Sequence, residues 1–228
     1  QSTVAITETV LTDNQADRDG GGLYLFDTPL TLIRSEIISN SAQSHAGGVY
    51  AYNFPSTVYV EKTRFHDNRA QFGGGGLSLN GPNGTMIDTV FTANRANGGA
   101  ALASNLGTLE VTVGTFSENE ATGGGGGALS VENAEGLTIT KTLLQENRAG
   151  QEGGALRVRN SDAFLENVAV VDNTSATEGS GLWFSSVDAT LNHVTLARNT
   201  GGDGTGLHIT HGGTNYSNVE VANTIIAG

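Results

Sequence analysis

An asparagine recurs along the chain at an almost constant interval, and this spacing limits the fold more than any other feature. The steps between successive members are 26, 28, 26, 25, 28, 26 and 26 residues, so one repeat is used eight times. A repeat of this length is typical of solenoids, in which each unit stacks on the next. The repeated asparagines are Asn14, Asn40, Asn68, Asn94, Asn119, Asn147, Asn173 and Asn199.

Large apolar residues keep fixed distances from each asparagine. One apolar residue lies three residues before the asparagine; Phe65, Phe91 and Phe116 are examples. Another lies five residues further upstream. After the asparagine, a glycine cluster opens a second apolar pair, such as Leu129 and Val131. Short segments that alternate with a period of two indicate strands rather than helices.

The sequence therefore predicts an all-β fold: a single-stranded right-handed parallel β-helix, or β-solenoid, of about eight coils of 25–28 residues. We expect two or three short strands in each coil, and a right hand because parallel crossovers adopt it. Residues 1–228 form a single β-helix domain in this interpretation, because the repeat continues without an internal boundary. The length varies mainly after the glycine-led strand, in segments such as "NFPST" and "THGGTNYS", which predicts loops there.

Five consecutive glycines occupy residues 123–127, where other repeats carry "AGG", "FGGGG" or "EGG". Glycine adopts positive φ without a steric penalty, so the run is interpreted as an enlarged turn and not as a linker. Asparagine also tolerates the left-handed conformation and can hydrogen-bond to its own kind in a stack. We therefore expect the eight repeated asparagines to form a structural ladder.

The composition excludes several function classes. The formal net charge is −12, which argues against binding the phosphate backbone of a nucleic acid. No run of 18 apolar residues is present, so no membrane span is expected. The chain has no cysteine, which removes disulfides, thiolate metal sites and a cysteine nucleophile.

Short motifs in the repeats resemble a known family. The segments "FHDN" (65–68), "FTAN" (91–94) and "FSEN" (116–119) are similar to the FxxN motif of the chlamydial polymorphic membrane proteins. The segment "GGAL" at 126–129 and 153–156 is similar to their GGA[ILV] motif, and bacterial right-handed β-helix surface proteins share the pattern. The resemblance implies an adhesin passenger located extracellularly or at the cell surface.

Aromatic residues on the glycine-led strands are the candidate contacts for a partner protein or a glycan. By alternation they point away from the core, and exposed aromatic patches often mark contact surfaces. The preferred interpretation is an aromatic ladder that only stabilises the sheet, covered by the "NFPST" loop, and a binding patch is the alternative. The candidates are Tyr24, Phe26, Tyr50, Tyr52 and Trp183.

Side chains with catalytic or metal-binding chemistry are scattered, so no catalytic residue and no cofactor is assigned. His208 and His211 are interpreted as surface histidines. The alternative is a histidine site with Asp203 upstream. An acidic column precedes the asparagines, and we expect its charges to pair with neighbouring arginines; Ca²⁺ binding is the alternative. The acidic residues are Asp13, Asp67, Glu118, Glu146 and Asp172, and the arginines are Arg69, Arg95, Arg148 and Arg198.

The favoured function is a non-catalytic extracellular structural or adhesive β-solenoid, and not an enzyme. Its expected partner is a second copy stacked end to end, or a host or cell-surface protein or glycan. Both termini lie in phase with the repeat, which suggests a filament subunit or a segment of a longer passenger. The alternative is a carbohydrate-binding or carbohydrate-cleaving β-helix protein. An ice-binding solenoid is less favoured, because outward threonines are sporadic.

Overall fold

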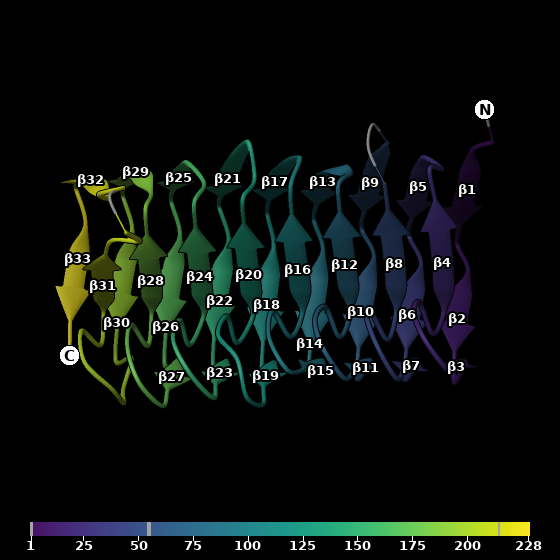
Figure 1. Cartoon of the computed structure of the whole chain (residues 1–228), viewed down its shortest axis with the longest axis horizontal. Helices are drawn as coiled ribbons and strands as arrows, with labels where there is room; N and C mark the ends of the chain where they lie inside the picture. The colour runs from purple at the N-terminus through teal and green to yellow at the C-terminus, as the bar shows by residue number, and fades with distance from the viewer. Residues whose placement is uncertain (1, 54–55, 214) are drawn as a thin grey trace.

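The chain folds into a stack of coils along one axis. The computed structural model describes residues 2–53, 56–213 and 215–228, and every regular element in these ranges is a β-strand. The strands of successive coils pair in parallel, and the two ends of the chain lie at opposite ends of the stack (Figure 1). The predicted parallel β-solenoid of about eight coils is therefore confirmed. None of the described residues forms a helix that is long and apolar enough to cross a membrane.

Two nine-stranded sheets, which we name A and B, supply the first two strands of each coil. Sheet A consists of β1 Val4–Thr7, β5 Leu30–Ile33, β9 Thr57–Glu61, β13 Asn83–Ile87, β17 Thr108–Thr112, β21 Gly136–Thr140, β25 Ala163–Glu166, β29 Asp188–Asn192 and β32 Asn218–Ala222. Sheet B consists of β2 Val10–Thr12, β6 Glu36–Ile38, β10 Arg64–His66, β14 Val90–Thr92, β18 Thr115–Ser117, β22 Leu143–Gln145, β26 Ala169–Val171, β30 Thr195–Ala197 and β33 Ile225–Ala227.

Sheets C and D complete the coil. Sheet C consists of β3 Gln15–Ala16, β7 Ser41–Ala42, β11 Arg69–Ala70, β15 Arg95–Ala96, β19 Glu120–Ala121, β23 Arg148–Ala149 and β27 Thr174–Ser175. Sheet D consists of β4 Leu23–Phe26, β8 Val49–Tyr52, β12 Leu77–Asn80, β16 Leu102–Asn105, β20 Leu129–Glu132, β24 Leu156–Arg159, β28 Leu182–Ser185 and β31 Leu207–Thr210. The expectation of two or three strands per coil was wrong for most coils, because the two residues after seven of the eight asparagines form a fourth, very short strand.

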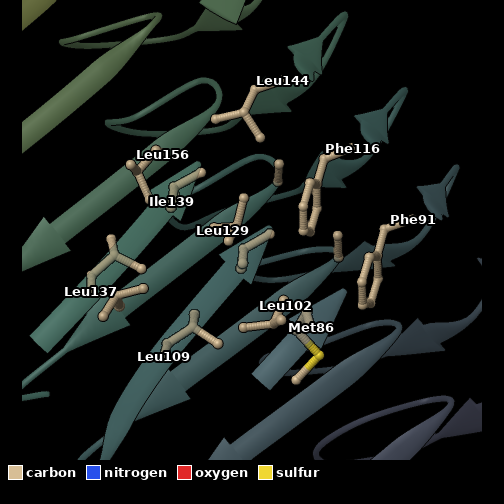
Figure 2. Close-up of a cluster of buried hydrophobic side chains, with 14 of the residues drawn as sticks. Met86, Phe91, Leu102, Leu109, Phe116, Leu129, Leu137, Ile139, Leu144 and Leu156 are labelled. Atoms are coloured by element: carbon tan, nitrogen blue, oxygen red, sulfur yellow. The ribbon is translucent and has the colours of Figure 1, made fainter. Parts of the chain in front are cut away.

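The core is a set of apolar columns that run through all the coils. Phe65, Phe91 and Phe116 are fully buried and occupy equivalent positions on sheet B. Their rings stack almost parallel, with centroids 4.4 Å apart for the first pair and 4.8 Å apart for the second. Figure 2 shows two of these rings beside inward-pointing side chains of sheets A and D, such as Leu109 and Leu129. A single coil could not enclose such a core, so the coils depend on each other for burial.

The repeated asparagines form a continuous hydrogen-bonded row at the corner between sheets B and C. The Oδ1 atom of Asn119 accepts the backbone N–H of Asn94 at 3.0 Å and its Nδ2 at 3.1 Å. The Nδ2 atom of Asn119 donates to Oδ1 of Asn147 at 2.9 Å and to the carbonyl oxygen of Phe91 at 3.0 Å. The same pattern joins all eight members from Asn14 to Asn199. All of them except Asn14 are buried, so their polar groups are satisfied by one another instead of by water.

A residue with a left-handed backbone conformation precedes each asparagine of this row. From the sequence, this conformation was expected at the asparagine itself. Glu118 has φ of 58° and Asp172 has φ of 59°, whereas the asparagines that follow them do not have positive φ. The asparagine supplies hydrogen bonds, and its neighbour makes the bend. A second left-handed column lies at the corner between sheets A and B, with Lys62, Asp88 and Val113 among its members.

Val113 is the residue least suited to the left-handed conformation at these corners. It is β-branched, it is 46% exposed, and its φ is 57°. A left-handed conformation costs an ordinary L-residue about 1–2 kcal/mol, and asparagine tolerates it better. Val113→Asn is therefore expected to raise the free energy of unfolding by about 1 kcal/mol, as measured by urea denaturation. Val10→Asn, on the exposed face of β2, is the control and should give no gain; equal effects would contradict the strain argument.

Candidate functional site

Sheet D presents two outward columns of side chains, because alternate residues of each strand face away from the core. Its strands pair in register, so residues of successive coils lie beside one another. The first column is Tyr24, Tyr50, Ser78, Ala103, Ser130, Arg157, Trp183 and His208. The second column is Phe26, Tyr52, Asn80, Asn105, Glu132, Arg159, Ser185 and Thr210.

Four of the predicted contact residues lie together on the first two coils. The rings of Tyr24 and Tyr50 are 5.6 Å apart, and those of Phe26 and Tyr52 are 5.7 Å apart. Tyr24, Phe26 and Tyr52 are 48%, 56% and 39% exposed; we call these three the aromatic strip. Tyr50 lies in the same outward column but is only 7% exposed, so it does not offer a free ring. Residues 54–55 of the "NFPST" loop lie outside the described residues, so cover by that loop stays a prediction.

Tyr50 is covered by side chains from the loops that lead into sheet D. The ring of His45 stacks on Tyr50 at 5.6 Å, and His45 contacts Phe72 at 5.4 Å. His45 is held by Asp19, whose Oδ1 accepts the backbone N–H of His45 at 3.0 Å and lies 3.2 Å from Nδ1. Burial alone would raise the pKa of Asp19, but the hydrogen bonds from Ser44 and His45 outweigh it and lower that pKa.

Trp183, the fifth predicted contact residue, lies far along the stack on β28 and is only 8% exposed. Its indole N–H donates to Oε2 of Glu178 at 3.2 Å, and the guanidinium of Arg157 lies 5.2 Å from its ring centroid. The same carboxylate oxygen lies 3.3 Å from Nε2 of His208. The structure therefore separates Trp183 from the aromatic strip and places it in a covered polar cluster.

Small residues in the middle of sheet D leave a groove of about 420 Å³ between these two aromatic groups. Ser78, Ala103 and Ser130 of the first outward column line its floor. One side is formed by the loops before sheet D, including Gly98, Gly124 and Gln151. The other side includes Asn80, Asn105 and Glu132, and the two ends are closed by Tyr50 with Phe72 and by Arg157. The sequence interpretation missed this groove, although the change from Tyr24 and Tyr50 to small residues in one column is visible in the repeat.

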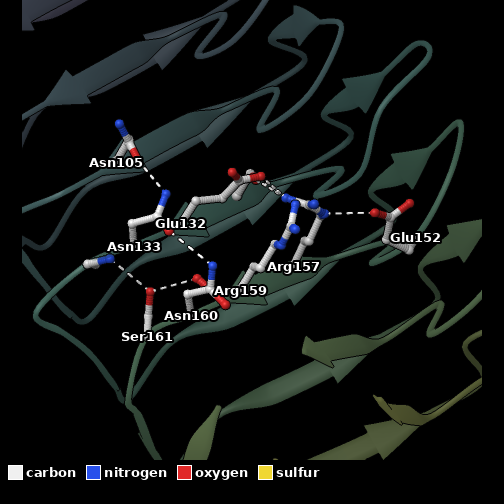
Figure 3. A network of polar contacts seen from close by, with 10 residues as sticks. Asn105, Glu132, Asn133, Glu152, Arg157, Arg159, Asn160 and Ser161 are labelled. Carbon is white, nitrogen blue, oxygen red and sulfur yellow. Dashed lines mark hydrogen bonds and ion pairs between the residues drawn. The ribbon is translucent and has the colours of Figure 1, made fainter. Parts of the chain in front are cut away.

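Arg157 closes its end of the groove with two ion pairs. Its Nη1 contacts Oε1 of Glu132, and its Nε donates to Oε1 of Glu152 at 2.8 Å (Figure 3). Burial alone would lower the pKa of Arg157, but the hydrogen bonds and charges of the two carboxylates outweigh it and raise that pKa. The guanidinium is therefore held as a cation between two carboxylates that also line the groove.

A second asparagine row, which the sequence interpretation also missed, runs along the edge of sheet D (Figure 3). Asn160 donates to Asn133, Asn133 to Asn105, and Asn105 to Asn80, each from Nδ2 to Oδ1 at 3.1 Å. These asparagines fall in segments that vary in length, so they do not share one position in the repeat. The row fixes Asn80 and Asn105 on the side of the groove.

The acidic column shows the predicted charge pairing at Asp67 and Asp172, whereas Glu118, Glu146 and Arg148 form no ion pair within the described residues. Arg69 contacts Asp67 at 3.1 Å, and Arg198 donates to Asp172 through Nε at 2.7 Å. The hydrogen bond from Arg198 lowers the pKa of Asp172. Arg95 pairs instead with Glu120 of the next coil at 2.8 Å. The described part of the chain contains no group of three or more His, Cys, Asp or Glu residues arranged to hold a metal ion.

The parallel stack defines the chain as a β-solenoid repeat protein. A scan against protein-family models, a search of curated proteins and a search of solved structures each found no match to this chain.

Proposed function

We propose that the chain is a non-catalytic extracellular structural or adhesive β-solenoid, and that sheet D is its contact face. The observation that carries this proposal is the exposure of three large aromatic side chains, Tyr24, Phe26 and Tyr52, side by side on a flat parallel sheet. Exposed aromatic surface of this kind is costly to leave in water and is typical of contact sites. The net charge of −12 supports a soluble surface module, and the FxxN and GGA[ILV] resemblance supports adhesion.

The charged groups on this face support a role in binding more than a role in catalysis. Hydrolysis of a glycosidic bond requires two carboxyl groups in different protonation states on either side of the bond. Glu132 and Glu152 instead share one guanidinium, that of Arg157. A shared cation of this kind is typical of a structural ion-pair network.

An adhesion assay tests the proposal. The labelled chain is applied to immobilised host-cell and matrix preparations, and bound protein is measured against the variant Tyr24→Ser/Phe26→Ser/Tyr52→Ser. We expect binding by the wild-type chain and at least tenfold weaker binding by the variant. Phe164→Ser, which removes a 39% exposed aromatic side chain from sheet A, is the matched control and should bind as wild type. Equal binding by all three proteins, or none by the wild type, would count against an adhesive sheet D.

Self-association end to end is a second candidate, and the last coil favours it. Val221, Ile225 and Ile226 are 47%, 60% and 54% exposed, and Val221 and Ile226 pair in register with the buried Leu191 and Leu196. Another coil stacked there would bury them, whether it belongs to the same polypeptide or to a second copy. Negative-stain electron microscopy over a range of concentrations separates the cases: long fibres support stacking of copies, and short discrete rods at every concentration contradict it.

A further inference from the structure

We propose that the groove on sheet D, lined by Ser78, Ala103, Ser130 and Arg157, binds a short stretch of a neutral, unbranched polysaccharide. This inference rests on the proposed function and names the ligand class for the contact face. The groove is distinct from the aromatic strip, which lies on the first two coils, beyond Tyr50.

The dimensions of the groove fit a linear chain of sugar rings. Its volume of about 420 Å³ lies within the range of ligand sites in proteins, roughly 300–1,000 Å³. Its floor is made by three consecutive coils, which repeat about every 4.8 Å. A pyranose ring within a linear glycan extends over a similar length, so successive rings can lie over successive coils.

The polar groups around the groove match the hydroxyl groups of a sugar. Two side-chain amides lie along one side, where Asn105 donates to Oδ1 of Asn80 at 3.1 Å and both amides are held in place by the second asparagine row. Ser78 and Ser130 place hydroxyl groups on the floor. Groups held rigidly before binding lose little entropy when a ligand arrives, which favours a defined ligand orientation.

The end of the groove near the aromatic strip supplies an apolar wall. Phe72 is 50% exposed and lies next to His45, which in turn stacks on Tyr50. The C–H faces of a sugar ring pack well against such aromatic surfaces, while its hydroxyl groups point toward the polar side. A combination of apolar wall and a few fixed polar groups is typical of small-ligand sites.

The charges facing the groove decide against an acidic polysaccharide. Arg157 carries one positive charge, and Glu132 and Glu152 carry one negative charge each, so these three groups have a net charge of −1. His45, at the opposite end, is paired with Asp19 at 3.2 Å. With a formal net charge of −12 on the whole chain, a polyanion would be repelled, whereas uncharged hydroxyl groups can bond to the carboxylate oxygens.

The test measures binding of neutral and acidic oligosaccharides to the full chain. Cellotetraose, maltotetraose and tetra-N-acetylchitotetraose are titrated by calorimetry up to about 10 mM, which detects Kd values near 1 mM, and tetragalacturonate is the acidic comparison. We expect at least one neutral tetrasaccharide to bind at least tenfold more tightly than tetragalacturonate. In amide spectra, shifts should concentrate at Gly98, Gly124 and Gly125, which line the groove.

A variant that fills the groove makes the test specific. Ala103→Tyr is compatible with the fold, because Tyr24, Tyr50 and Trp183 occupy the same outward column. It should weaken binding of the neutral tetrasaccharide at least tenfold. The matched control is Thr138→Tyr on sheet A, whose column already holds Tyr59 and Phe164, and it should leave binding unchanged.

Three outcomes would overturn the inference: no neutral tetrasaccharide binds, Ala103→Tyr binds as tightly as wild type, or tetragalacturonate binds more tightly. If the chain adheres to host preparations through the aromatic strip but none of these sugars binds, the groove inference fails while the adhesive function stands. If sugars bind in the groove but removal of the strip does not alter adhesion, the proposed contact residues fail instead. A peptide or protein as the only ligand would likewise overturn the glycan assignment.

Discussion

Replacing Gly127 with alanine is expected to destabilise the chain strongly, because the added methyl group has no room between two coils. A Cβ atom at this position would overlap the carbonyl oxygen of Gly154 in the next coil and lie 2.7 Å from the carbonyl carbon of Arg148. Both neighbours are backbone atoms of the adjacent coil, so neither can move without separating the stack. We expect a loss of about 3 kcal/mol in the free energy of unfolding, measured by urea denaturation followed by circular dichroism.

The control for this substitution is Gly136→Ala on β21. A Cβ atom there meets no atom within 4 Å, and the residue does not have positive φ. Such a substitution restricts the unfolded chain and is expected to stabilise by about 0.4–1 kcal/mol. If Gly127→Ala unfolds at the same urea concentration as wild type, the close stacking of turns described for the glycine run is incorrect.

Asn119→Ala is expected to have an effect of similar size, through lost hydrogen bonds instead of a steric clash. The substitution leaves the backbone N–H of Asn94 and one side-chain N–H of Asn94 without the acceptor that they have at 3.0 and 3.1 Å. Both groups are buried, and each unsatisfied buried polar group costs about 1–3 kcal/mol, so we expect a total loss of about 3 kcal/mol. The unfolding transition should be followed by both circular dichroism and the fluorescence of Trp183, since repeat proteins need not unfold in one step.

The terminal member of the same row provides the comparison. Asn14 is exposed, and its Nδ2 donates to Asn40 at 2.9 Å from the open end of the ladder. Water can replace this contact, so Asn14→Ala should cost less than about 1 kcal/mol. Equal costs at Asn14 and Asn119 would mean that the buried row does not stabilise the stack in the way described.

The stack was predictable because its cause is periodic. Each coil must bury the same columns, so Phe65, Phe91 and Phe116 recur at a nearly fixed interval and are found in register. The backbone conformation at the corners was harder to predict from the sequence, because the side chain of a residue such as Ala93 does not indicate its φ of 55°. The pattern identifies the asparagine, and only the backbone shows that the residue before it makes the bend.

The candidate site was less predictable than the fold, because it depends on which outward side chains are covered by neighbouring residues. Tyr50 and Trp183 follow the outward alternation, yet His45 covers the first and Glu178 and Arg157 surround the second. His45 and Glu178 come from loops whose positions the repeat does not specify, whereas Arg157 lies on β24. The floor of the groove and the side with Asn80 and Asn105 could have been inferred from the outward columns, but the side formed by the loops before sheet D could not.

Simultaneous measurement of binding and cleavage tests the central claim, that sheet D is a contact face without catalytic chemistry. The chain is incubated with insoluble and soluble neutral polysaccharides, and bound protein and newly formed reducing ends are determined in the same samples over time. The account predicts bound protein with no increase in reducing ends. A steady release of reducing ends that is abolished in Glu132→Gln or Glu152→Gln would contradict it and identify a carbohydrate-cleaving enzyme.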